Sequence, residues 1–299
     1  MKIKDSFHTY AIITIIFWSL ANVLTRLSLH YFSAFSLGFF RYLIASCALI
    51  VFAIVTKMKV PKKADIKWFV IAGFVGFFLY MIAFNKGCET VSSSTSSVML
   101  ATVPVITSLL SRFIYKEKLN VIKWAAIAVE FSGVIVLTLM EGVFTFNPGL
   151  LWLFGAAMLL SVYNLLQRKI TKKYSGLQAS TFGIFSGTIM LAIFLPTTIK
   201  QVQTAPPIAF VYVAVLGVFT SAVAYAAWSQ AFKKAKNAAS VSNYMFVTPF
   251  LASLMGYLLA GEKPDSATLI GGGIILLGLF AFNFGERILK HKEIETVGE

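Results

Sequence analysis

An internal repeat is the feature of this sequence that most limits its fold. A shift of 145 positions superimposes Gly38 on Gly183, Tyr80 on Tyr225, Pro104 on Pro249, Glu117-Lys118 on Glu262-Lys263 and Gly133 on Gly278. Each half holds about five long apolar runs, and an odd number of membrane crossings per copy would turn the second copy upside down relative to the first. The repeat therefore predicts two inverted five-helix units, residues 1–145 and 146–285, followed by a tail, residues 286–299.

Composition places these runs in a membrane. The chain is 58% hydrophobic and 13% charged, with a mean hydropathy of +0.80, whereas about 25% charged residues is usual in soluble domains. Each run is close to the roughly 20 residues that cross a ~30 Å hydrocarbon layer. We predict an all-α integral membrane protein with ten transmembrane spans: 8–29, 33–56, 67–86, 93–115, 121–140, 148–168, 177–198, 208–230, 239–260 and 267–285.

The positive charges predict the orientation of these spans. If the N-terminus is inside, the cytoplasmic segments hold 21 of the 26 lysine and arginine residues, which is the bias described by the positive-inside rule. We therefore expect both termini on the cytoplasmic side of a multi-pass protein of the cell membrane, in bacteria the inner membrane. The net charge of +14 then reports orientation, and no nucleic-acid partner is expected.

Three groups of residues resemble the EamA family of ten-helix permeases, within the drug/metabolite transporter superfamily. These are the repeated proline followed by Glu-Lys (Pro104 with Glu117-Lys118, Pro249 with Glu262-Lys263), the segment Phe40–Ala45 and the segment Phe17–Asn22. The resemblance covers residues 8 to 285. It implies export or exchange of small polar metabolites, often amino acids and their relatives. It also implies a central cavity lined by the first, third, fourth, sixth, eighth and ninth spans.

Helical spacing gives an independent view of such a cavity, because residues three or four apart share one face. One face of the third span carries Gly73, Gly76, Tyr80, Ala83 and Gly87, and the corresponding face of the eighth carries Gly217, Ser221, Tyr225, Trp228 and Phe232. A packing seam would explain the glycines. The symmetry-related Tyr80 and Tyr225, together with Trp228, favour a cavity wall or gate, since these rings combine an apolar body with a polar tip.

Side chains of other spans complete the predicted binding site. Trp18 and Asn22 lie one turn apart, and the shift maps them onto Tyr163 and Gln167, with Asn164 beside them. An amide inside hydrocarbon needs a partner, so these amides either bind substrate or tie helices together. The ninth span contributes Asn243 and Tyr244, the counterparts of Val98 and Met99; Met99 suits either an adaptable substrate wall or the core.

Two prolines and two charges inside the spans have alternative interpretations. Pro104 and Pro249 predict kinks, which are either hinges for alternating access or fixed bends. Arg41 either binds a substrate carboxylate or forms a structural ion pair or helix cap, and its counterpart is Ser186. Glu130 is either a proton-coupling carboxylate or a packing residue, and its counterpart is Ile275.

Glycines recur every seven residues along the tenth span, at Gly271, Gly278 and Gly285. A smooth stripe of this kind predicts close helix packing, which could lie across a homodimer formed through the fifth and tenth spans.

The leading functional hypothesis is a secondary transporter that moves small polar metabolites by alternating access. The alternatives are a polyspecific drug or cation exporter and a translocase of lipid or lipid-linked substrates. A membrane enzyme would need clustered histidines, cysteines or carboxylates, yet His8, His30 and His291 all lie near span ends or loops. We therefore expect no enzymatic activity, no cofactor and no metal.

Overall fold

The computed structural model describes residues 6–116, 119–140, 147–234 and 243–297, and all regular secondary structure in these ranges is helical. Glu117-Lys118, one copy of the repeated motif, and the predicted boundary between the halves at residue 145 lie outside the described residues. Elements of residues 7–140 are α1 (Phe7–Ser28), α2 (Ala34–Val55), η2 (Lys63–Asp65), α3 (Ile66–Gly73), η3 (Phe74–Leu79), α4 (Tyr80–Cys88), α5 (Ser93–Leu100), α6 (Val103–Tyr115) and α7 (Val121–Met140).

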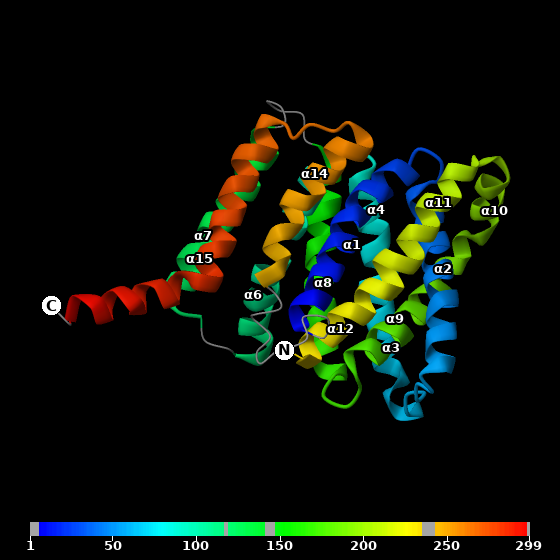
Figure 1. Ribbon diagram of the computed structural model, residues 1–299, viewed down its shortest axis with the longest axis horizontal. Helices are drawn as coiled ribbons and strands as arrows, with labels where there is room; N and C mark the ends of the chain where they lie inside the picture. The colour runs from blue at the N-terminus through cyan, green and yellow to red at the C-terminus, as the bar shows by residue number, and fades with distance from the viewer. Residues whose placement is uncertain (1–5, 117–118, 141–146, 235–242, 298–299) are drawn as a thin grey trace.

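The later elements follow a similar order. They are α8 (Pro148–Ile170), α9 (Gly176–Leu191), η4 (Ala192–Phe194), α10 (Leu195–Thr204), α11 (Pro207–Val215), η5 (Leu216–Val223), α12 (Ala224–Lys234), η6 (Asn243–Val247), α14 (Thr248–Ala260) and α15 (Ser266–Val297). The predicted tail, which begins at residue 286, is helical as far as Val297, and these final turns of α15 project from the bundle in Figure 1.

Hydroxyl side chains fix where several helices begin. Ser6, Ser33, Ser92 and Ser175 each accept a hydrogen bond from a backbone N–H in the first turn of the helix that follows. These bonds satisfy donors that have no partner inside the helix. Ser92, the first residue of the serine-rich segment 92–97, therefore caps α5, and residues 93–97 are buried within that helix.

Two helices contain a π-helical segment at positions related by the 145-residue shift. The segment η3 joins α3 to α4, and η5 joins α11 to α12; residues 219–223 of η5 correspond to residues 74–78 of η3. A π segment places an extra residue in the turn, and such segments are frequent at functional sites. In η5 the carbonyl of Leu216 accepts hydrogen bonds from the hydroxyls of Thr220 at 2.7 Å and Ser221 at 2.9 Å.

The repeated prolines stand at helix starts. Pro104 lies in the first turn of α6, after α5 ends at Leu100, and Pro249 lies in the first turn of α14, after the short η6. Proline is tolerated there because the first N–H groups of a helix have no intrahelical partner. Each apolar run is thus divided into two helices at its proline.

The α7 and α15 helices lie side by side and antiparallel at one edge of the bundle (Figure 1). Gly278 contacts Glu130 while Gly133 contacts Ile275, and these two contacts exchange under the 145-residue shift. Gly271 and Gly285 face Leu137 and Ile122 of α7. The glycine stripe is therefore used within one chain, so a homodimer through these helices would have to use their other faces.

Within the described residues, eight continuous helical stretches, some made of several elements, are long and apolar enough to cross a membrane: Phe7–Ser28, Ala34–Val55, Lys63–Cys88, Ser93–Tyr115, Pro148–Ile170, Gly176–Thr204, Pro207–Ala231 and Ser266–Gly285. The 20-residue α7 is not among the eight, and α14 is a shorter apolar helix of 13 residues. The two halves are closely packed together: α1 contacts α12 and α14, α2 contacts η5, and α4 contacts α8.

Candidate functional site

Aromatic rings from both halves meet near the middle of α1. The Trp18 ring lies 5.7 Å from that of Tyr225 and 5.0 Å from that of Trp228, measured between centroids. Phe77 of η3 then links Tyr225, at 6.0 Å, to Tyr163 of α8, at 5.1 Å. We call Trp18, Phe77, Tyr163, Tyr225 and Trp228 the aromatic cluster. It brings together four of the residues that the sequence predicts for a binding site.

Small residues in the third span allow this arrangement. A Cβ at Gly76 would overlap the ring of Tyr163, so only glycine lets this ring lie against η3. Gly187 similarly accommodates Phe77. The predicted glycine face is therefore a packing seam that at the same time positions rings of the cluster. Tyr80 lies on the next helix, α4, where its ring stacks on Phe84 at 5.8 Å.

The predicted amides differ in their surroundings. Gln167 donates to the hydroxyl of Tyr163 and, at 3.4 Å, to Ser180, whereas its buried side-chain oxygen has no partner in the described part of the chain. Asn22 donates to the Trp18 carbonyl at 3.1 Å and accepts from Ser96 at 3.1 Å.

The remaining candidates differ in what surrounds them. Asn164 donates to Thr107 of α6 at 3.3 Å, and Met99 is buried in the largest core cluster. Tyr244 bonds to His8 at the start of α1, at 2.5 Å. The side chain of Asn243 lies outside the described residues.

The two buried charges occupy different places. Arg41 of α2 reaches into η5, where its Nε lies 3.1 Å from Ser221 Oγ and its Nη2 lies 3.0 Å from Thr220 Oγ1. Glu130 is buried between α7 and α15, and neither of its side-chain oxygens has a hydrogen-bond partner among the described residues. Glu130 is thus a residue of the α7–α15 interface, which is not where the aromatic cluster lies.

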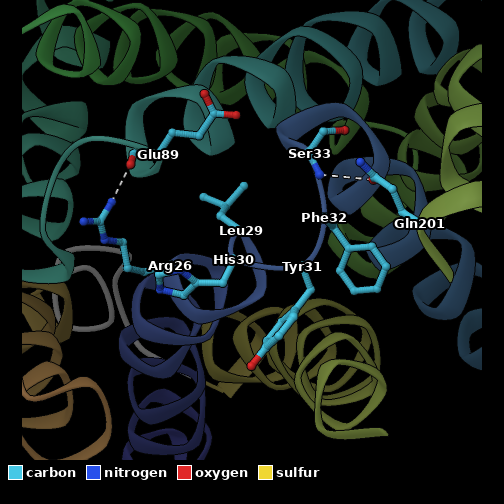
Figure 2. A pocket seen from close by; sticks show the side chains of 8 residues that line it. All are labelled: Arg26, Leu29, His30, Tyr31, Phe32, Ser33, Glu89 and Gln201. Atoms are coloured by element: carbon cyan, nitrogen blue, oxygen red, sulfur yellow. Dashed lines mark hydrogen bonds between the residues drawn. The ribbon is translucent and has the colours of Figure 1, made fainter. Parts of the chain in front are cut away.

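A cavity of about 470 Å³ opens at the C-terminal end of α1 (Figure 2). Its lining consists of Arg26, Leu29, His30, Tyr31, Phe32, Ser33, Glu89 and Gln201. Arg26 Nη1 donates to the carbonyls of Cys88 at 2.8 Å and Glu89 at 2.6 Å. We call this the outer cavity, because the charge distribution predicts that this end of α1 faces outward.

Glu262 joins the two halves beside the outer cavity. Gly261 ends α14 with a positive φ of 66°, and Glu262 then lies 3.4 Å from Arg26 Nε and accepts from the backbone N–H of Ser93 at 2.8 Å. A carboxylate at a helix N-terminus is favourable. This geometry gives a physical role to the second copy of the repeated Glu-Lys motif.

Sequence reasoning missed Phe77 and Thr220 and gave Ser221 no partner, although these residues connect the predicted ones to one another. Phe77 is one of several phenylalanines in an apolar run, and periodicity does not separate it from those that face outward. Ser221 does lie on the predicted face of the eighth span. The buried cation Arg41 in the second span indicated that polar partners such as hydroxyl groups would be needed, but the sequence did not show which ones.

Comparison with known proteins gives a consistent result. The sequence pattern of the EamA-like transporter family matches residues 6–139 and again residues 147–284. The chain is 32% identical to the uncharacterized transporter YdfC of Bacillus subtilis, over 89% of this chain and 87% of that protein. It is 26% identical to a probable terminal-alkyne amino-acid exporter of Streptantibioticus cattleyicolor, over 96% of each.

A more distant relative and one solved structure extend this comparison. The chain is 24% identical to an S-adenosylmethionine uptake transporter of Rickettsia prowazekii, over 85% of this chain and 84% of that protein. A crystal structure shares the fold, with a TM-score of 0.65 at 17% identity, over 95% of this chain and 99% of that chain.

Proposed function

The chain belongs to the EamA-like transporter family, and from this premise we propose that it is a secondary transporter that exports or exchanges small polar metabolites such as amino acids. Transport is what the three relatives described above share by name. We place it in the cell membrane, in bacteria the inner membrane, and propose that it moves its substrate without chemical change.

The proposed architecture is ten transmembrane spans in two inverted five-helix repeats, with both termini in the cytoplasm. Support comes from the two successive family matches, and from the π segments and proline positions that recur under one shift. The antiparallel contact of α7 with α15 gives further support, because the contacts of Gly133 and Gly278 exchange under the same shift. Contacts of this kind are expected from a two-fold axis lying in the membrane plane.

The aromatic cluster is the observation that carries the proposed mechanism. Trp18 and Phe77 come from the first half of the chain, and Tyr163, Tyr225 and Trp228 come from the second. A rocking motion of one half against the other would change the separation of these rings and could open the site to alternate sides. The helix starts at Pro104 and Pro249 are the proposed hinges.

Small zwitterionic or neutral metabolites fit this site better than the two alternative substrate classes. A drug or cation exporter is disfavoured because the buried charge beside the cluster, Arg41, is positive. A lipid translocase would need a lateral opening toward the bilayer, whereas the outer cavity lies at a helix end. The free oxygen of Gln167 is an acceptor that a substrate amine could use.

Counterflow uptake by purified protein in liposomes tests the proposal. The vesicles are loaded with unlabelled compounds and exposed to pools of labelled amino acids, nucleobases or lipophilic cations, at two pH values, with empty liposomes as the control. We expect uptake of neutral amino acids that survives collapse of the proton gradient. Uptake of cations driven by that gradient would overturn the metabolite proposal in favour of a drug antiporter, and silence in every pool would favour lipid substrates.

A further inference from the structure

Arg41 is a buried cation whose protein contacts are all uncharged. It is 6% exposed, and its two hydrogen bonds go to the hydroxyls of Ser221 and Thr220. Those hydroxyls donate to the Leu216 carbonyl, which leaves their oxygen lone pairs to face the guanidinium. No carboxylate of the described ranges lies within ion-pairing distance of Arg41. A guanidinium stays protonated in proteins, so this charge is not neutralised by the protein residues described.

The environment of Arg26 shows what a fully paired arginine looks like in this chain. Arg26 bonds to two carbonyls and pairs with Glu262, although its side chain is 29% exposed to solvent. Arg41 is more deeply buried and has fewer acceptors. Taking a charge out of water costs several kcal/mol when no opposite charge compensates it. The Tyr42 ring, 5.8 Å from Cζ of Arg41, offers partial compensation. A bound anion would therefore stabilise this position, and the described chain does not supply one.

The free donors of Arg41 have the geometry of a carboxylate site. A guanidinium has five N–H donors, and the bonds to η5 use one from Nε and one from Nη2. Nη1 forms no hydrogen bond with any residue in the described ranges. A guanidinium can bind a carboxylate through two parallel hydrogen bonds either from its Nε and Nη2 or from its Nη1 and Nη2, and in Arg41 the second of these edges is the one that the bonds to η5 leave open.

Arg41 lies between the outer cavity and the aromatic cluster. Ser33, which lines the outer cavity, precedes Arg41 by eight residues of α2, or about 12 Å of helix rise. On the opposite side Ser221 precedes Tyr225 by four residues, or about 6 Å. A molecule held by Arg41 could thus reach the aromatic rings with an apolar group several ångströms long.

We propose that Arg41 binds the carboxylate of the transported molecule, and that the site therefore selects amphiphilic carboxylates, zwitterionic amino acids included, over the corresponding amides. The proposal rests on the transport function proposed above and narrows its substrate class. Rings of the aromatic cluster hold the apolar part, and they also offer faces to which an ammonium group binds.

The test begins with binding, which does not depend on transport. Purified full-length protein in detergent is heated with each neutral L-amino acid or with its primary amide, and the shift in melting temperature is recorded against concentration. We expect at least one acid to stabilise the protein, and its amide to need at least tenfold higher concentration for the same shift. Equal stabilisation by acid and amide, or stabilisation by none of the acids, would overturn the proposal.

Variants then assign the selectivity to Arg41. Arg41→Gln should reduce the acid–amide difference to less than twofold, and Arg41→Lys should retain part of it because the positive charge remains. Arg112→Gln is the matched control, since Arg112 is exposed on α6 and its removal should leave the difference unchanged. Full selectivity in Arg41→Gln would contradict the assignment. If that variant does not fold, the wild-type comparison and Arg41→Lys decide.

Counterflow separates this proposal from the transport function. Acid-selective binding that depends on Arg41, without uptake of the same acid, would retain the carboxylate site and refute the transport proposal. Uptake of amides as fast as acids would retain transport and overturn the carboxylate site.

Discussion

Replacement of Gly278 by alanine should destabilise the protein through a single, well-defined contact. A Cβ at this position would lie 2.7 Å from the backbone nitrogen of Glu130, whereas ordinary contacts begin at 3.4 Å. The obstacle is backbone, so no side-chain rotation relieves it. The α15 helix must therefore move away from α7 by about 0.7 Å, the difference between these two distances.

The loss of stability in Gly278→Ala comes from the van der Waals contacts between α7 and α15 that this movement weakens. A gap of 0.5–1 Å forfeits roughly a quarter to a half of the dispersion attraction between the atoms it separates, and overpacking of a close contact typically costs about 1–3 kcal/mol. Alanine also gains up to about 1 kcal/mol over glycine in helix propensity. We expect Gly278→Ala to melt below the wild type, because the steric cost exceeds this gain.

Gly273→Ala is the matched control on the same helix. A Cβ at Gly273 meets no atom within 4 Å, so only the gain in helix propensity applies and the variant should melt at or above the wild type. The assay is thermal unfolding of purified protein in detergent, followed by intrinsic fluorescence. The two variants should differ by about 1–3 kcal/mol, which is the steric term alone. Equal melting temperatures would refute the close packing of α7 on α15.

Three further predictions concern the interior. Trp228→Ala should lower counterflow at least tenfold without loss of folding, because it removes a ring of the aromatic cluster; the exposed Trp124→Ala should not, and normal transport by the first variant would remove that cluster from the site. Gly76→Ala should abolish transport or folding, because its Cβ overlaps Tyr163; wild-type uptake and melting would contradict the described packing. Glu130→Met should raise the melting temperature by removing a buried carboxyl group without partners, and a marked fall would reveal an unrecognised partner.

The helix positions were predictable because apolar length and the internal repeat both constrain them. The expected run 121–140 is α7, Val121–Met140, and the run 33–56 is α2 with its cap at Ser33. The π segments were not predictable, since a shift from i→i+4 to i→i+5 bonding has no distinct composition. At Pro104 and Pro249, where kinks are predicted, a new helix begins one residue before the proline, and sequence alone does not distinguish such an interruption from a bend in a continuous helix.

The site was predictable where helical spacing and the repeat agreed. Tyr225 and Trp228 share a face of the eighth span, and the structure places both beside Trp18. Spacing says nothing about contacts between distant helices, so the role of Phe77 and the bonds of Arg41 to η5 required the structure. Tyr244, predicted as a binding residue of the ninth span, bonds to His8 and packs with Trp228 against Ala11 and Ala231, contacts between helices that spacing within one span does not reveal.

The π segments also determine in which direction the side chains that follow them point around the helix axis. An α-helix turns by about 100° per residue, so deletion of one residue from η5 that restored regular α-helix would swing Tyr225 and Trp228 by that angle about the helix axis. The rings would then leave Trp18, while every residue before Leu216 kept its neighbours. The segments η3 and η5 occupy related positions. A deletion in η5 alone would therefore rotate the face that carries Tyr225 and leave the related face, which carries Tyr80, unchanged.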